Sequence, residues 1–273
     1  MTVAGVQEIC ADLAGEQAAL DGLVAELDDE DWDRATPAEG WMVRDQISHL
    51  AWFDGAARLA VNDHEALAAA VAGVTSTDEL MAIHLRKGRG LNPAELLAWW
   101  RGEGAALLDT VAGLHAKDRI PWFGVTMSAP SFVTARLMET WAHGQDVVDG
   151  LGVQRVPTAR LRHVAHLGVL ARPWSYATRG LDPPRDGVFI DLGAPGGGRW
   201  TWGDERWPDR VRGTALDFCL VVCQRRHVAD TGLEVEGESA VGWMAIAQVF
   251  NGPPGAGRRP GQFPRDGASS TGG

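Results

Sequence analysis

The sequence predicts an α+β protein: a four-helix bundle over residues 1–152, a small domain containing a sheet over 153–252, and a disordered tail over 253–273. In the first half, apolar residues recur every three to four positions over long segments, which is typical of amphipathic helices. In the second half, short alternating apolar runs and glycine-rich turns indicate strands. The charge changes as well, because residues 1–150 carry 24 acids against 10 bases, whereas residues 151–273 carry 12 acids against 15 bases.

Four long helices are expected in the first half, and breaks or capping residues separate them. Thr36–Gly40 interrupts the helical period, and Asn92 begins a new helix with a polar cap, a proline and an early acid. Thr77 is a further helix start of the same kind, and the acidic run Glu26–Asp33 fits a solvated helix end and turn. The long helices are expected at 2–27, 43–62, 92–114 and 131–149. Their short connections favour an antiparallel bundle.

The second half predicts short strands and helices on a small sheet. A helix is expected over Thr158–Tyr176, broken near Pro173. Gly196–Gly198 lacks the following helix and lysine of a phosphate loop, so it is expected to be a hairpin turn. The remaining strands are expected at 187–192, 199–202, 210–213 and 233–236, and the remaining helices at 214–225 and 239–250. The tail is expected to be disordered because 10 of its 21 residues are Gly or Pro.

The composition excludes several classes of protein. A net charge of −11 disfavours binding to nucleic-acid phosphates. The three cysteines include no CxxC pair, so they indicate neither a disulfide framework nor a zinc knuckle. No apolar stretch approaches the roughly 18 to 20 residues of a membrane helix, and Glu8, Asp12 and Glu16 interrupt the region a secretory signal requires. We therefore expect a cytoplasmic monomer or homodimer without membrane or nucleic-acid partners.

Three side chains of the bundle form a candidate metal site. Glu139 and His143 are four residues apart, so they lie on one face of a helix, one turn apart. His49 lies in the middle of the expected helix 43–62, on or near its apolar side. In an antiparallel bundle these helices can face each other, which would give two imidazoles and one carboxylate. Such a set suits zinc, nickel, iron(II) or manganese and leaves positions open for water or substrate.

Structural interpretations of the same residues stay open at this point. A histidine on an apolar helix is often a core residue with one hydrogen bond, and Cys219 and Cys223 fit packing positions on helix 214–225. The cations that end this helix, Arg225 and Arg226, complement the helix dipole, or alternatively bind a carboxylate. Asp45, one turn before His49, is either a partner of that ligand or a surface acid. Among the other histidines no partner at ligand spacing stands out, since His163 and His166, three residues apart, have arginines beside them that would repel a cation.

Two stretches resemble signatures of a known family, the DinB-like mycothiol-dependent maleylpyruvate isomerases. They are Gly40–Ala51 (GWMVRDQISHLA) and Ala135–Val147 (ARLMETWAHGQDV), and the likeness extends up to Pro254. The resemblance implies a four-helix bundle in which His49, Glu139 and His143 bind a divalent metal, usually zinc. It also implies a C-terminal domain similar to sterol-carrier folds.

The resemblance further implies a functional arginine on the helix that follows Gly213. Arg225 is the residue expected to act in catalysis, and with its neighbour Arg226 it is expected to hold the thiol cofactor or an anionic substrate near the junction of the domains. The longer middle section, the Trp-rich hairpin Trp200–Trp207 and the tail depart from the isomerase itself and fit larger actinobacterial homologues.

The activity implied by the resemblance depends on mycothiol. A metal-activated thiolate attacks an electrophilic small molecule, giving cis–trans isomerisation. Two alternative functions remain open. One is a mycothiol S-transferase of secondary metabolism or detoxification that performs no isomerisation, and the other is a non-catalytic metalloprotein that binds small molecules. A DNA-damage-related role is disfavoured by the acidity of residues 1–150.

Overall fold

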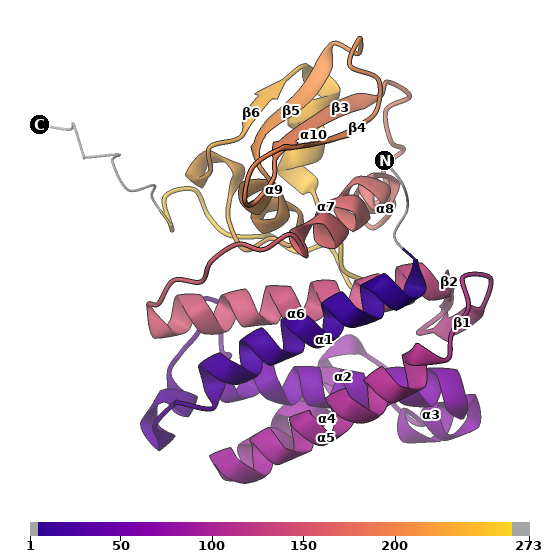
Figure 1. Cartoon of the computed structure of the whole chain (residues 1–273), viewed down its shortest axis with the longest axis vertical. Coiled ribbons are helices and arrows are strands. Elements are labelled where there is room, and N and C mark those ends of the chain that lie inside the picture. The colour runs from indigo at the N-terminus through magenta and orange to yellow at the C-terminus, as the bar shows by residue number, and fades with distance from the viewer. Residues whose placement is uncertain (1–4, 264–273) are drawn as a thin grey trace, which may run out of the picture. The chain divides into compact units, whose positions relative to one another are not determined.

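The computed structural model describes residues 5–263. Contacts divide the chain into two compact units, Thr2–Arg155 and Val156–Gly273, and Figure 1 shows a helical unit and a unit that contains a sheet. No helix within the described part of the chain is both long and apolar enough to span a membrane.

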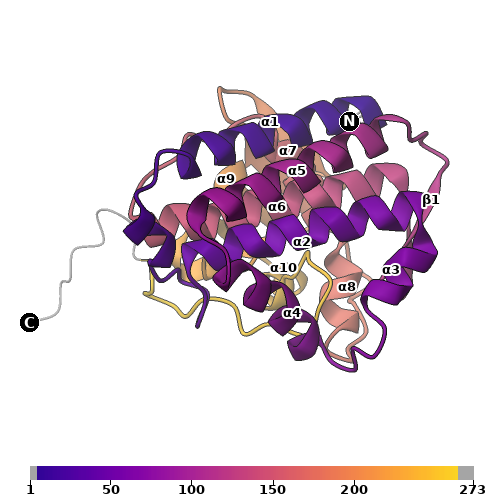
Figure 2. The same cartoon turned by 90° about the horizontal axis from the view of Figure 1, so that it is seen from below.

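The first unit is a bundle of four long helices that lie side by side in both views (Figures 1 and 2). These helices are α1 (Val6–Val24), α2 (Val43–Asn62), α5 (Pro93–Ala112) and α6 (Ala129–Leu151). Helices α1 and α2 each pack against both α5 and α6. The predicted α+β class and its four-helix bundle are therefore confirmed, and α2 has the predicted bounds.

The bundle is held by a continuous apolar core. Ile47, Leu50 and Val43 of α2 are fully buried and pack with Trp100 of α5 and Val147 of α6. Complete burial of one such aliphatic side chain contributes about 1.5–3 kcal/mol. A buried ion pair between Asp54 of α2 and Arg136 of α6, with Nη2 2.8 Å from Oδ1, also joins two of these helices.

Several short elements of the bundle were not expected from the sequence. They are the 3-10 helix η1 (Asp29–Asp33), helix α3 (His64–Ala70) and a hairpin of β1 (Arg119–Trp122) and β2 (Val125–Ser128). The hairpin was missed because Pro121 and the Phe123–Gly124 turn resemble a loop. Within the acidic run, Trp32 is buried at 2% exposure, so η1 is anchored to the core and is not simply a solvated turn. Helix α4 (Thr77–Arg89) begins where the sequence placed a start.

The second unit contains a four-stranded sheet with strand order β4-β3-β5-β6. Its central strands β3 (Val188–Gly193) and β5 (Asp209–Thr214) are parallel, while β4 (Arg199–Trp202) and β6 (Glu234–Glu236) pair antiparallel at the edges. All four strands lie within two residues of their expected positions. The helices of this unit are α7 (Leu161–Leu170), α8 (Arg172–Ala177), α9 (Ala215–Val222), the 3-10 helix η2 (Val228–Asp230) and α10 (Glu238–Ile246).

Two helix ends in this unit differ from the expectation. The expected helix 214–225 ends at Val222, and the next residues turn through Gln224 at φ 58°. The expected helix 239–250 ends at Ile246, because Ala247 is extended and the Val249 N–H bonds the Val222 carbonyl at 3.0 Å. As expected, Cys219 is buried in the packing of α9, and burial raises its pKa well above the ordinary value.

The tail follows a defined path as far as the structure describes it. Residues 253–263 contain no helix or strand, but the backbone N–H groups of Gly261 and Phe263 donate to the Asp230 carboxylate at 2.7 and 3.2 Å. Gln248 of the sheet unit also binds this segment, because its Oε1 accepts from the Gly255 N–H at 3.2 Å. The expected disorder of the tail remains a prediction. The expectation for residues 264–273 lies outside the described residues.

Candidate metal centre

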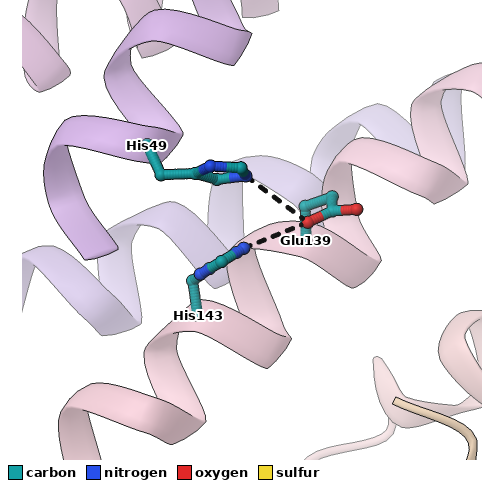
Figure 3. Close-up of side chains that lie close together, drawn as sticks. All are labelled: His49, Glu139 and His143. Atoms are coloured by element: carbon teal, nitrogen blue, oxygen red, sulfur yellow. Dashed lines mark ion pairs between the residues drawn. The ribbon is translucent and has the colours of Figure 1, made fainter. Parts of the chain in front are cut away.

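The three candidate ligands converge between helices α2 and α6 (Figure 3). His49 extends from α2, and Glu139 and His143 extend from successive turns of α6, so both rings point toward the Glu139 carboxylate. Glu139 Oε2 lies 3.8 Å from His49 Nε2 and 3.2 Å from His143 Nε2. One ligand atom of each residue lies within 4.8 Å of the other two. The helix packing thus brings together the set that the spacing proposed.

The protonation states of this cluster suit a cation. Burial, together with the nearby His143, holds the pKa of His49 well below its ordinary value, so that ring is neutral near pH 7. Burial opposes ionisation of Glu139, but hydrogen bonds and charge interactions with His143 and His49 hold its pKa well below the ordinary value. A neutral imidazole and an ionised carboxylate are the forms that bind metals.

The second nitrogen of His143 is held by Gln46 of α2. Gln46 Oε1 lies 2.5 Å from His143 Nδ1, and Gln46 Nε2 donates to Thr36 Oγ1 at 2.9 Å. Because the amide nitrogen is engaged with Thr36, the amide oxygen faces the ring and accepts the Nδ1 proton. In the tautomer that a bound cation requires, this proton lies on Nδ1, and the Nε2 lone pair faces the cation instead of donating a hydrogen bond to Glu139.

The second nitrogen of His49 meets a third histidine, His84 of α4, which sequence reasoning did not select. His49 Nδ1 and His84 Nε2 are 3.4 Å apart, and burial lowers the pKa of His84 to about 4. A hydrogen bond joins the backbone of α4 to α2 next to the site, because Ser48 Oγ donates to the His84 carbonyl at 2.5 Å. No spacing in the sequence relates His84 to His49, because their proximity arises from the packing of α4 on α2.

The residues present fit a divalent cation. Two imidazole nitrogens and one carboxylate form the donor set of catalytic zinc sites, which keep further positions for water or substrate. The side chains remain partly accessible, with 11% of His49, 21% of Glu139 and 11% of His143 exposed. The outer nitrogen of each ring has a polar neighbour, as is general for metal-binding histidines.

Asp45 has a structural role that neither sequence interpretation described. It is fully buried rather than a surface acid, its Oδ2 accepts from the Met42 N–H at 2.9 Å, and Arg89 Nη2 of α4 bonds it at 2.8 Å. The carboxylate therefore caps the start of α2 and joins α2 to α4. Among its hydrogen bonds in the described residues, none goes to His49.

The two candidate arginines belong to the other unit of the chain. Arg225 and Arg226 follow α9, and Arg225 Nη1 donates to the Cys223 carbonyl at 2.7 Å. The Arg226 guanidinium lies 3.7 Å from the centre of the Phe263 ring. Both side chains are half-buried. Their action on substrate or cofactor remains a prediction.

Comparisons with known proteins agree with this architecture. Residues 13–148 match the family described as the mycothiol maleylpyruvate isomerase N-terminal domain. Two uncharacterized proteins of Mycobacterium tuberculosis, from strains CDC 1551 and H37Rv, are each 43% identical over 252 residues, covering 91% of this chain and 97% of the relative.

Two solved structures share the fold. A mutant of the mycothiol-dependent maleylpyruvate isomerase matches with a TM-score of 0.60 and 16% identity over 88% of this chain and 99% of that chain. A second crystal structure of that isomerase matches with a TM-score of 0.56 and 18% identity over 83% and 93%. These structures show the shared fold, and with it the match of residues 13–148 shows that this chain belongs to the mycothiol maleylpyruvate isomerase family.

Proposed function

We propose that the chain is a metal-dependent enzyme that joins the thiol mycothiol to an electrophilic small molecule, with His49, Glu139 and His143 as the metal ligands. The observation that carries the proposal is the convergence of three donor atoms within 4.8 Å at the meeting of α2 and α6. The family to which the chain belongs, and the name of the isomerase that shares its fold, support mycothiol as the thiol.

The chain's own residues prepare the site for this chemistry. Zinc bound there would supply Lewis-acid chemistry that lowers the pKa of a coordinated thiol, so that a thiolate is available at neutral pH. Gln46 and His84 hold the two imidazole rings with their Nε2 atoms toward Glu139. With the ligands in the forms that bind metals, an ionised carboxylate and two neutral imidazoles, the set would carry one negative charge and leave a bound divalent cation net positive.

The proposed reaction is a conjugate addition in which a carbon–sulfur bond forms as a carbon–carbon double bond opens. The proton lost from sulfur is returned to the carbon that receives the electron pair. Rotation about the resulting single bond, followed by loss of that proton and cleavage of the carbon–sulfur bond, gives cis–trans isomerisation with the thiol regenerated. When the carbon–sulfur bond is kept, the same addition is S-transfer. Anionic substituents of the substrate are proposed to bind Arg225 or Arg226.

Metal analysis of the purified protein tests the site. We expect about one divalent ion per chain in the wild type and a large loss in His49→Ala, since the variant removes one of three protein ligands. Zinc, nickel, iron and manganese are measured together by mass spectrometry. A wild type that takes up no stoichiometric ion after incubation with each metal contradicts the proposal.

Turnover of mycothiol with a panel of enones and enoyl acids separates isomerisation from transfer. Isomer formation with constant free thiol indicates the isomerase, whereas stoichiometric loss of thiol indicates the S-transferase. Arg225→Ala is expected to raise KM for carboxylate substrates more than for neutral ones, because the guanidinium binds the carboxylate. Metal-loaded protein that binds electrophiles but leaves every rate at background supports a non-catalytic binding protein instead.

A further inference from the structure

Five aromatic side chains lie beside the candidate metal centre, and we call them the aromatic wall. The wall consists of Trp41, Trp52, Phe53, Trp122 and Phe123, which come from the loop before α2, from α2 itself and from the end of the β1–β2 hairpin. Four of these rings are in contact one after another, with centroid distances of 4.8 Å for Trp52–Phe53, 5.9 Å for Phe53–Phe123 and 4.6 Å for Trp122–Phe123. Trp41 is linked to them through the His49 ring, which contacts both Trp41 and Phe53. All except Phe53 are half-buried, so these rings keep surface available to a ligand.

The wall is directly connected to the ligand rings. The Phe53 centroid lies 4.4 Å from that of His49, one helical turn away on α2. Trp41 lies 5.5 Å from His49 and 5.9 Å from His143, and its plane is inclined by only 19° to the His143 ring. A flat group held against these rings is therefore adjacent to a reaction at the metal centre.

Phe123 occupies a backbone conformation that is unfavourable for its side chain. It forms the two-residue turn of the hairpin with Gly124, and its φ is 37°, in the left-handed region that glycine and asparagine tolerate and bulky residues rarely adopt. Glycine at this position would relieve that cost. A phenylalanine kept where glycine is preferred points to a use for its ring.

The wall is apolar in character. The cation–π pairs found among residues 5–263 put Lys87 over Trp99 and Arg155 over Trp141 in the bundle, and none involves a ring of the wall. The wall thus offers stacking surfaces rather than counter-ions to the part of a substrate that lies against it.

We propose that this wall binds an aryl group conjugated to the electrophilic double bond, so that the site takes aryl-substituted enones or enoyl acids in preference to small aliphatic ones. This proposal depends on the proposed function in one respect, namely that the reacting carbon of the substrate lies at the metal centre. A carboxylate elsewhere on the substrate remains compatible with it, because the wall contacts only the aryl end.

The test compares benzylideneacetone with ethylideneacetone, which has a methyl group in place of the phenyl group. Binding to zinc-loaded full-length protein is measured by calorimetry without thiol, and kcat/KM is then measured with mycothiol. We expect the aryl enone to bind at least about tenfold more tightly, since stacking and burial of one ring supply that much affinity. Equal affinities overturn this proposal and leave the metal–thiol chemistry intact. Tight binding of the aryl enone without any thiol-dependent turnover contradicts the proposed reaction but leaves the aryl-binding role of the wall intact.

Phe123→Gly separates a binding role from a structural one. We expect the variant to keep or raise Tm, because glycine suits the turn, while the aryl-to-methyl preference falls about three- to tenfold. Phe123→Tyr should retain the preference because it retains the ring. Trp99→Leu is the matched control, a half-buried aromatic stacked under Lys87 at 3.6 Å, and should leave the preference unchanged. A fall in Tm for Phe123→Gly with an unchanged preference contradicts the proposal.

Discussion

Each candidate ligand ring is oriented by a neighbour at its outer nitrogen, and these neighbours could not be selected from the sequence. The Glu139–His143 pair is predictable because both residues lie one turn apart on a single helix. Gln46 lies 97 residues from His143 and His84 lies 35 residues from His49, so only tertiary packing brings each pair together. Local spacing thus identified the ligand pair on α6, while the neighbours of the two histidine rings depend on the packing of α2, α4 and α6.

Gln46→Leu removes the acceptor at His143 Nδ1 while keeping a side chain of similar size. We expect zinc affinity to fall about 10- to 100-fold, because the ring loses the partner that fixes its tautomer and orientation. Competition with a chromophoric chelator measures the change. Gln46→Glu keeps an acceptor and should retain most of the affinity.

Gln145→Leu is the control for loss of a buried amide from the same region. Gln145 of α6 is 7% exposed, and its Nε2 donates to Asp149 Oδ1 at 2.9 Å rather than to a histidine. Its replacement should leave zinc affinity unchanged. Equal affinities of Gln46→Leu and wild type would rule out the orienting role.

At the scale of elements, the spacing of apolar residues predicted the helices and strands that bury one face along their whole length. The range of α2 was predicted without error, and the strands of the sheet alternate clearly enough to be placed within two residues. The hairpin β1–β2 has strands of only four residues, one of them containing Pro121, so no period could be recognised. The end of α9 was misplaced because Gln224 adopts a left-handed turn without the glycine that usually marks one.

Helix α4 approaches α2 so closely that Gly88 leaves no room for a side chain. A Cβ at Gly88 would overlap the Ser48 side chain, which also bonds the His84 carbonyl. Gly88→Ala is therefore expected to displace α4, lowering the free energy of unfolding by about 1–3 kcal/mol through overpacking. Zinc affinity should fall as well, because His84 moves away from His49. Urea denaturation and chelator competition give the two quantities.

Gly102→Ala provides the matched control in α5. A Cβ there has no neighbour within 4 Å, so the substitution should raise the free energy of unfolding by about 0.5–1 kcal/mol through helix propensity. Zinc affinity should not change. If Gly88→Ala behaved like Gly102→Ala, the close approach of α4 would have no bearing on the metal centre.

For the whole molecule, the change in charge along the chain coincides with a change in architecture. The acidic residues 1–150 correspond closely to the helical unit Thr2–Arg155, and the mildly basic remainder to the unit with the sheet. Fold and family could be predicted because helical period, strand alternation and the two signature stretches all persist over many residues. The proposed preference for aryl substrates could not be predicted, since the aromatic wall combines the loop before α2, helix α2 and an unpredicted hairpin.

The division into two units predicts where bound metal stabilises the chain. All three proposed ligands lie on α2 and α6, so zinc at 100 times its dissociation constant should stabilise their unit by about 2.7 kcal/mol. In hydrogen exchange, amides of α2, α4 and α6 that open by unfolding of this unit should therefore slow about 100-fold, while those of β3 and β5 keep their rates. His49→Ala should abolish the effect. Equal slowing in β3 and β5 would instead show that metal binding stabilises both units together.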